Sequence, residues 1–183
     1  IEVFLFEIIC DGDRYSYNYL LYYLAHMLQK PEEKPTVAVI LLGGQGIGKG
    51  AFYKLLKTIW RYTMRQVQSI DEVTGRFTAA ALEQSLGVWM DEALFAGDKK
   101  SADRLKALIT EDRITIEEKY QPAKTMQSFH RIFGASNHEH FAPTDRDDRR
   151  FVFLRVSEAW KQDASKFAPL FAAYSDGHSV SAF

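Results

Sequence analysis

The chain has 183 residues, 46% of them hydrophobic and 26% charged, which is typical of a globular domain with one sizeable core or at most two small ones. Its net charge of −1 gives no global attraction to nucleic acid, so any such binding must come from a local patch. A single cysteine excludes a disulfide framework, and the lack of a visible signal peptide or of an apolar run of about 18 residues predicts a cytoplasmic protein without a membrane span.

The first predicted element is a helix over residues 15–29. Leucines and a methionine recur there at helical spacing, so one face of the helix is apolar. The prolines of residues 30–35 then predict a turn. We therefore expect residues 1–36 to form an N-terminal helical segment that packs on the core.

A glycine-rich loop comes next, between a predicted strand and a predicted helix. Residues 37–42 are continuously apolar, as in a buried parallel strand, and residues 51–62 have an amphipathic helical pattern. Glycines let the backbone turn so that successive N–H groups face one concavity, and the following helix adds free N–H groups and the positive end of its dipole. This order predicts a phosphate-binding loop.

The candidate binding residues are the loop and the first residue after it: Gly43, Gly44, Gln45, Gly46, Ile47, Gly48, Lys49, Gly50 and Ala51. Lys49 would bring a point charge to the outer phosphates of a nucleotide. Gly50 departs from the usual pattern, in which Ser or Thr places a hydroxyl on magnesium. The alternative interpretation is a glycine-rich turn that only precedes a helix.

An acid pair follows the next strong strand. After a possible strand at 66–70 and a short helix at 77–84, the apolar residues 87–90 end in Asp91 and Glu92. We expect this strand to lie beside the loop strand, with Asp91 holding magnesium and Glu92 orienting or deprotonating the attacking water. Such pairs also occur at strand ends without function.

Residues 101–110 read as a helix with Ser101 as its N-cap, and residues 114–117 and 126–129 alternate like the arms of a β-hairpin. The turn region carries Lys119, Tyr120 and Lys124. Lysines at a hairpin tip can contact phosphates, and an aromatic ring can stack on a base. An exposed hairpin with solubilising lysines is the alternative.

Two further groups of polar residues adjoin strands. Asn137 ends the predicted strand 131–137, and its amide can hydrogen-bond both a γ-phosphate and a water, or form a turn. Arg149 and Arg150 precede the last strand, 151–156. They can stabilise a transferring phosphoryl group in cis or from a neighbouring subunit, or belong to a charge cluster that pairs internally.

Strands interleaved with helices predict an α/β fold with a central, mainly parallel sheet flanked by helices, plus the β-hairpin as an insertion. We expect the nucleotide-binding core to span residues 37–160 and residues 161–183 to form a C-terminal tail.

The order of these motifs resembles the superfamily 3 helicases of viruses, phages and plasmids. The closer similarity is to the helicase domain of phage and prophage primase-helicase proteins. Residues 24–31, 43–50 and 147–151 carry it, and it covers about residues 15–156. The resemblance implies a P-loop, AAA+-like core that forms ring hexamers and couples ATP hydrolysis to translocation on single-stranded DNA.

By this resemblance, Lys49 corresponds to the phosphate-binding lysine, Asp91 to the magnesium-linked acid and Glu92 to the catalytic base. Asn137 corresponds to the sensor. The related primase-helicases share Gly50, so the resemblance implies that nucleotide binding survives without the hydroxyl.

The resemblance also places Lys119 on a DNA-facing hairpin and makes Arg149 or Arg150 a trans-acting finger. The implied function is an ATP-dependent DNA helicase domain for phage- or plasmid-type replication. ATP and Mg²⁺, single-stranded DNA, a homohexameric ring and an attached or cooperating primase or polymerase domain would be its partners. The alternatives are an ATPase motor or remodeller that does not act on DNA, and a nucleotide-binding assembly module without turnover.

Overall fold

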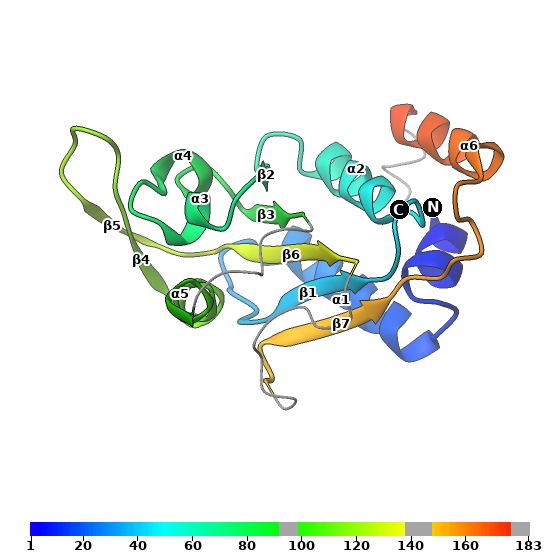
Figure 1. The fold of residues 1–183 in the computed structure, drawn as a ribbon, viewed down its shortest axis with the longest axis horizontal. Helices are drawn as coiled ribbons and strands as arrows, with labels where there is room; N and C mark the ends of the chain where they lie inside the picture. The colour runs from blue at the N-terminus through cyan, green and yellow to red at the C-terminus, as the bar shows by residue number, and fades with distance from the viewer. Residues whose placement is uncertain (92–98, 138–147, 177–183) are drawn as a thin grey trace.

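The computed structural model describes residues 1–91, 99–137 and 148–176 (Figure 1). Its centre is a five-stranded sheet in the order β2-β3-β6-β1-β7, in which every neighbouring pair is parallel. The strands are β1 (Ala38–Leu42), β2 (Met64–Val67), β3 (Gly87–Met90), β6 (Arg131–Ser136) and β7 (Phe151–Arg155). The prediction of an α/β fold with a mainly parallel sheet is confirmed.

Helices cover both faces of this sheet. They are η1 (Phe4–Ile9), α1 (Arg14–Gln29), α2 (Lys49–Ile59), α3 (Asp71–Thr74), α4 (Ala79–Leu82), α5 (Lys99–Thr110) and α6 (Ala164–Ser175). The π-helical turn η1 packs with α1, α2 and α6 against one face, whereas α3, α4 and α5 pack against the other. The short helices η1 and α3 were not predicted.

Strand β1 shows why both faces are buried. Val39 and Leu41 point into the core beneath α1 and α2, while Ala38 and Ile40 point into the core beneath α5. All four are fully buried. Successive strand residues alternate between faces, so a continuous apolar run is what a strand covered on both sides requires.

The position of β3 corrects one expectation. The acid-tipped strand does not lie beside the loop strand, because β6 pairs with both β1 and β3. Every residue of β6 is buried, which suits the middle of the sheet. The carboxyl end of β6 therefore lies between the ends of β1 and β3.

The N-terminal helix α1 is closed at both ends by side chains. Asp13 accepts a hydrogen bond from the Ser16 amide at 2.8 Å and so caps the helix start. At the other end the fully buried Arg131 donates to the carbonyl oxygens of Lys30 and Glu33 at 2.7 and 2.6 Å. These bonds join the turn after α1 to the first residue of β6.

A two-stranded antiparallel arm projects from the sheet, at the opposite end of the molecule from α6 (Figure 1). Its strands are β4 (Arg113–Ile116) and β5 (Lys124–Gln127), with Ile116 opposite Lys124 at the outer end. We call residues 113–127 the β4–β5 arm.

Two expectations about helices need correction. The helix α5 begins at Lys99, so Ser101 lies inside it and is not its N-cap. The segment expected to be a tail contains α6, which Asp163 caps by accepting from the Ser165 amide at 3.0 Å. Apolar residues at positions 167, 170, 171 and 174 give α6 a helical stripe that was present in the sequence.

Among the helices of the described ranges, none combines the length and apolar character that crossing a bilayer requires.

Candidate functional site

The loop between β1 and α2 depends on its glycines. Gly43, Gly46 and Gly48 have φ values of 144°, 77° and 117°, a region that residues with side chains rarely adopt. A Cβ at Gly43 would lie 2.5 Å from Ile47 Cδ1 and 3.2 Å from the Val156 carbonyl oxygen. Ile47 is fully buried and supports the loop from inside. The sequence therefore folds into a turn that exposes backbone toward a cleft.

Lys49 is the first residue of α2 and is only 9% exposed. Its ammonium donates to the Gly44 carbonyl oxygen at 2.7 Å, to Asn137 Oδ1 at 2.5 Å and also to the Gly43 carbonyl oxygen. A lysine has three N–H donors, so these contacts use all of them. The lysine charge is thereby held between the glycine loop and the end of β6.

Asn137 and Asp91 follow β6 and β3, at the same edge of the sheet as the glycine loop. Asp91 is exposed, and Gln66 Nε2 donates to its Oδ2 at 3.3 Å. Lys49, Asp91 and Asn137 line one cleft of about 990 Å³. The structure thus brings together three of the residues predicted for catalysis and metal binding.

Most of the loop residues line this cleft as well. Gln45, Gly46, Gly48, Gly50 and Ala51 do so, together with Lys49. A Cβ at Gly50 would meet nothing within 4 Å, so there is room for the hydroxyl-bearing side chain that this chain lacks.

The cleft has a second wall that the sequence analysis missed. Gln162, Ala164, Phe167 and Phe171 line it from the start and one side of α6. Tyr53, Lys54 and Trp89 line it from α2 and β3, and Gln66 and Gln68 line it from β2 and the residues that follow. The apolar periodicity of residues 164–175 indicates the helix, but nothing in the sequence indicates that it faces the glycine loop.

The arginines lie elsewhere. Both precede β7, at the amino edge of the sheet, whereas the glycine loop is at the carboxyl edge. Arg150 Nη1 lies 3.1 Å from Asp148 Oδ1, and Lys106 Nζ lies 3.4 Å from Asp148 Oδ2. Burial would raise the pKa of Asp148, but its hydrogen bonds to Arg150 and Lys106 hold that pKa below its usual value. Arg150 therefore takes part in an internal charge cluster, while Arg149 is exposed.

The remaining candidates are also apart from the cleft. On the β4–β5 arm, Tyr120 is 91% exposed and Lys119 Nζ lies 5.3 Å from its ring centroid. Lys124 is tied to the body by an ion pair with Glu83. Glu92 lies outside the described residues, so the structure gives no position for the predicted base.

Within the described ranges, no three His, Cys, Asp or Glu side chains cluster as a metal site would require. Among the described residues that line the cleft, Asp91 alone has a carboxylate side chain. A Mg²⁺ ion commonly takes one or two carboxylates and completes its shell with substrate phosphates and waters. Among the described residues, the donor set at this cleft fits Mg²⁺ that arrives with a nucleotide and does not supply enough ligands for a metal held by protein alone.

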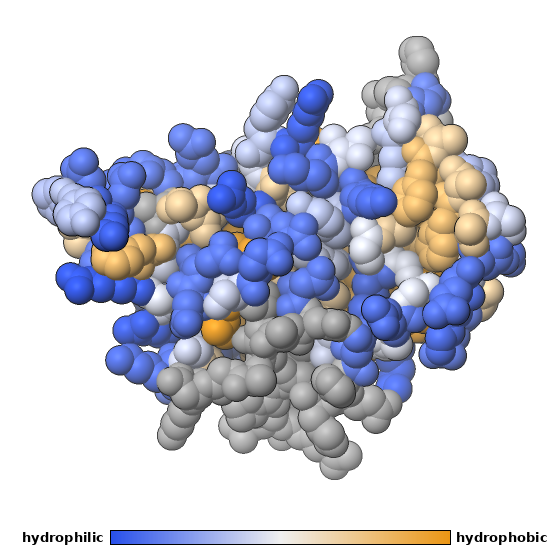
Figure 2. Space-filling model, turned by 45° about the horizontal axis from the view of Figure 1, so that its top comes forward, coloured by the Kyte–Doolittle hydropathy of each residue, from blue (hydrophilic) through white to orange (hydrophobic). Residues whose placement is uncertain are grey.

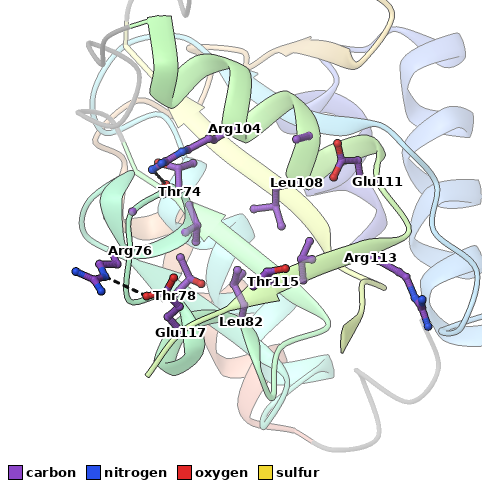
Figure 3. Close-up of a pocket in the computed structure, with 14 residues that line it drawn as sticks. Thr74, Arg76, Thr78, Leu82, Arg104, Leu108, Glu111, Arg113, Thr115 and Glu117 are labelled. Carbon is purple, nitrogen blue, oxygen red and sulfur yellow. Dashed lines mark hydrogen bonds and ion pairs between the residues drawn. The ribbon is translucent and has the colours of Figure 1, made fainter. Parts of the chain in front are cut away.

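A second cleft, of about 690 Å³, lies between α3, α5 and β4 (Figure 3). Two of its three arginines are engaged: Arg104 donates to the Thr74 carbonyl oxygen at 2.6 Å, and Arg76 pairs with Glu117 at 3.1 Å. Arg113 extends away from the other labelled side chains. This cleft contains none of the predicted site residues.

Solved structures share this fold. The apo structure of the NrS-1 C-terminal region (305–718) aligns with a TM-score of 0.82 and 25% identity over 97% of this chain. Two A-form apo structures of the NrS-1 C-terminal region align over 96% of the chain at 24% identity, with TM-scores of 0.81 and 0.78. The chain spans only 42–43% of those solved regions.

No curated protein matches the chain. A sequence model described as "Family of unknown function (DUF5906)" matches residues 41–150, a range that includes the glycine loop, Asp91, Asn137 and both arginines. The chain therefore belongs to the DUF5906 family.

Proposed function

We propose that this chain is an ATP-dependent DNA helicase domain that couples ATP hydrolysis to movement along single-stranded DNA. The observation that carries the proposal is the convergence of Lys49, Asp91 and Asn137 on one cleft beside the glycine loop. The fold similarity to the NrS-1 C-terminal region supports a helicase-related role.

The residues of the cleft have distinct roles in this proposal. The glycine-loop amides and Lys49 bind the β- and γ-phosphates of ATP, and Asp91 holds Mg²⁺. The ion would neutralise charge on the phosphates when bound. Glu92, the residue after Asp91, acts as the base toward the attacking water. Asn137 positions that water through its amide.

The contacts of Lys49 suggest how nucleotide binding is sensed. All three donors of its ammonium lie on protein oxygens, one of them on Asn137. A phosphate oxygen must replace at least one of these acceptors. Release of Asn137 Oδ1 from Lys49 would free that amide to face the γ-phosphate and the water.

Arg149 is the better candidate for a finger that acts on a neighbouring subunit. Arg150 is held by Asp148, whereas Arg149 is exposed and makes no ion pair within the described ranges. The five residues of β7 span about 17 Å and separate Arg149 from the cleft edge of its own sheet. Only a cleft in another copy of the chain would be within reach, which supports a closed ring, with six subunits by resemblance.

The β4–β5 arm is the proposed contact for single-stranded DNA. Its exposed tip offers Lys119 for a phosphate and Tyr120 for stacking on a base. Lys124, being paired with Glu83, would hold the arm in place. Because the chain spans less than half of the NrS-1 region, a primase or polymerase domain elsewhere in a longer protein remains part of the proposal.

ATP hydrolysis with and without single-stranded DNA tests this function. We expect DNA to stimulate turnover, and a Lys119→Ala, Tyr120→Ala variant to lose the stimulation while retaining basal turnover. DNA-independent hydrolysis would instead favour a motor that acts on another substrate. ATP binding without hydrolysis by the assembled protein would favour an assembly module.

A further inference from the structure

The cleft beside the glycine loop has two chemically different ends. The loop end is polar, with Lys49, Asp91 and Asn137. At the α6 end, Phe167 and Phe171 are half-buried and stack on each other, with ring centroids 6.2 Å apart and planes at 22°. Figure 2 shows a broad apolar patch at the end of the molecule where α6 lies. A ligand that fills the whole cleft must therefore have a charged part and an apolar part.

Several contacts fix the α6 wall relative to the loop. The backbone N–H of Gln162, shortly before α6 begins, donates to the Gly46 carbonyl oxygen at 3.0 Å. A Cβ at Gly48 would lie 3.3 Å from Phe167 Cε1, so this glycine allows the ring to approach the loop. The start of α6 is thus attached to the backbone that would bind phosphates.

The spacing along α2 suits a nucleotide. Lys54 Nζ lies 4.3 Å from the ring centroid of Phe171, and Lys54 follows Lys49 by five residues, or about 7.5 Å along the helix axis. A nucleotide also places its base beyond its phosphates, with the ribose between them. Phosphates bound at Lys49 would therefore direct the base toward the α6 end.

Trp89 forms the buried floor behind Tyr53 at this cleft. It lines the cleft, is 1% exposed and packs against Tyr53 with ring centroids 5.4 Å apart. Its indole N–H is buried and has no hydrogen-bond partner within the described part of the chain. A buried donor without an acceptor is unfavourable, and Arg131 Nε and Tyr174 Oη are two further such groups in the described ranges.

We propose that Tyr53, Phe167 and Phe171 form a stacking wall for the base of the nucleotide, with the buried Trp89 packed against Tyr53. The wall makes the cleft prefer purine to pyrimidine nucleoside triphosphates, with little discrimination between adenine and guanine. This inference rests on the proposed nucleotide binding at Lys49.

The chemistry of the wall sets this selectivity. Stacking on aromatic rings increases with the area of the base and is tolerant of its identity. Among the polar side chains that line the cleft, Gln66 donates to Asp91 and therefore lies at the loop end. A larger purine therefore gains more from the wall than a pyrimidine does.

The test compares nucleotides with a phosphate chain that lacks a base. Dissociation constants of MgATP, MgGTP, MgCTP and magnesium tripolyphosphate are measured with the full 183-residue chain. The same measurements are made with Phe171→Leu, which keeps apolar volume but removes the ring, and with Phe171→Trp, which keeps a ring. Phe77→Leu is the matched control, since Phe77 is 50% exposed and does not line the cleft.

We expect Phe171→Leu to bind ATP and GTP at least about fivefold more weakly than the parent, which is the lower range for loss of one stacked base. Tripolyphosphate binding should not change, and Phe171→Trp and Phe77→Leu should behave like the parent. The parent should bind ATP and GTP with similar affinity and CTP more weakly.

Equal ATP affinities for the parent and Phe171→Leu would overturn the stacking wall and leave the nucleotide site intact. So would a parent that binds CTP as tightly as ATP, a comparison that needs no variant to fold. If Phe171→Leu also lost tripolyphosphate binding, the substitution would have disturbed the phosphate-binding loop. The proposal of a stacking wall would then be contradicted. A parent that binds neither ATP nor tripolyphosphate would contradict the proposed function itself.

Discussion

The two ends of β6 show what polar residues do in this fold. At the amino end, the guanidinium of Arg131 is buried and donates to the carbonyl oxygens of Lys30, Pro31, Glu33 and Phe129. At the carboxyl end, Asn137 lines a cleft and accepts a hydrogen bond from the ammonium of Lys49. The amino end uses polar groups to join backbone segments, whereas the carboxyl end presents them where a ligand can compete.

The charge cluster at the amino edge also uses polar groups to join parts of the protein, since Asp148 binds both Arg150 and Lys106. Burial lowers the pKa of Arg131, yet a guanidinium remains charged at physiological pH. The difference between the two edges is therefore one of access. Arg131 is fully buried, whereas Lys49 binds the Gly43 and Gly44 carbonyl oxygens and Asn137 Oδ1 beside an open cleft, where a phosphate can compete for it.

Arg149 is the exception at the amino edge, and it gives the largest expected effect. Arg149→Ala should lower ATP turnover by about 10³–10⁵-fold while ATP still binds, because the finger acts only in the transition state. Mixing Arg149→Ala with Lys49→Ala subunits should restore some turnover, since a mixed interface can pair an intact loop with an intact arginine.

Arg150→Ala is the matched control for that experiment. Its partner is Asp148 of the same chain, so we expect lower thermal stability and near-normal turnover per folded molecule. If mixed rings form and remain inactive, or if Arg149→Ala hydrolyses ATP normally, the trans-acting role of Arg149 fails.

Arg131→Leu tests the amino end of β6 directly. It removes a charged donor from several carbonyl groups, and hydrogen bonds to charged groups contribute about 1.5–3 kcal/mol each. We expect a loss of about 3 kcal/mol in the free energy of unfolding, measured with urea, and unchanged ATP affinity of the folded protein. Weaker ATP binding with unchanged stability would contradict the division between the two ends.

A buried histidine gives the amino end a pH dependence. His130 Nε2 lies 2.9 Å from the Leu82 carbonyl oxygen, and its Nδ1 lies 2.9 Å from Ser128 Oγ, which accepts from Lys34. Because a carbonyl only accepts, Nε2 carries the proton and Nδ1 is an acceptor. Burial lowers the pKa of His130 below its usual value, and the bond to Leu82 opposes this only in part.

Below about pH 6.5 the unfolded chain binds a proton at this histidine that the folded chain does not bind. The free energy of unfolding should therefore decrease as the pH is lowered from about 6.5 to the lower pKa of the folded state. The decrease is at most about 1.4 kcal/mol per pH unit. Urea unfolding at several pH values should show a steeper decline for the parent than for His130→Gln. Parallel curves would contradict a neutral buried His130.

Gly50→Ser gives the smallest expected effect, at the carboxyl edge. The added Cβ meets no atom within 4 Å, so the helix should accept it and gain a few tenths of a kcal/mol from the better helix former. If Asp91 suffices to organise Mg²⁺, the metal affinity measured in the presence of ATP should change by less than about tenfold. A large gain in turnover would show that the native loop is compromised.

The sequence could predict those features that residues close together in the chain determine. The apolar run of β1, the glycines and Lys49 are neighbours in the chain, so their spacing alone indicates strand, loop and helix. The order of strands is different, because nothing in residues 131–136 says that β6 separates β1 from β3.

The α6 wall is the other part that the sequence did not reveal. Phe167 and Phe171 come more than 100 residues after Lys49, and their place in the cleft depends on how residues 157–163 return to the loop. Hydrogen bonds such as Ser157 N to the Ile8 carbonyl oxygen and Gln162 N to the Gly46 carbonyl oxygen, at 2.8 and 3.0 Å, direct that return. Because these bonds join backbone atoms, they do not require particular residue types and cannot be recognised in the sequence.

Calorimetric titration of MgATP into the parent and two lysine variants tests most directly the central claim that this cleft binds a nucleotide. Lys57→Met is the matched control for Lys49→Met, since both lysines are on α2 but Lys57 donates to the Met64 carbonyl oxygen at 2.7 Å. We predict that the parent and Lys57→Met bind MgATP, and that a folded Lys49→Met does not. Equal binding by all three, or none by the parent, would contradict the assignment of this cleft to a nucleotide.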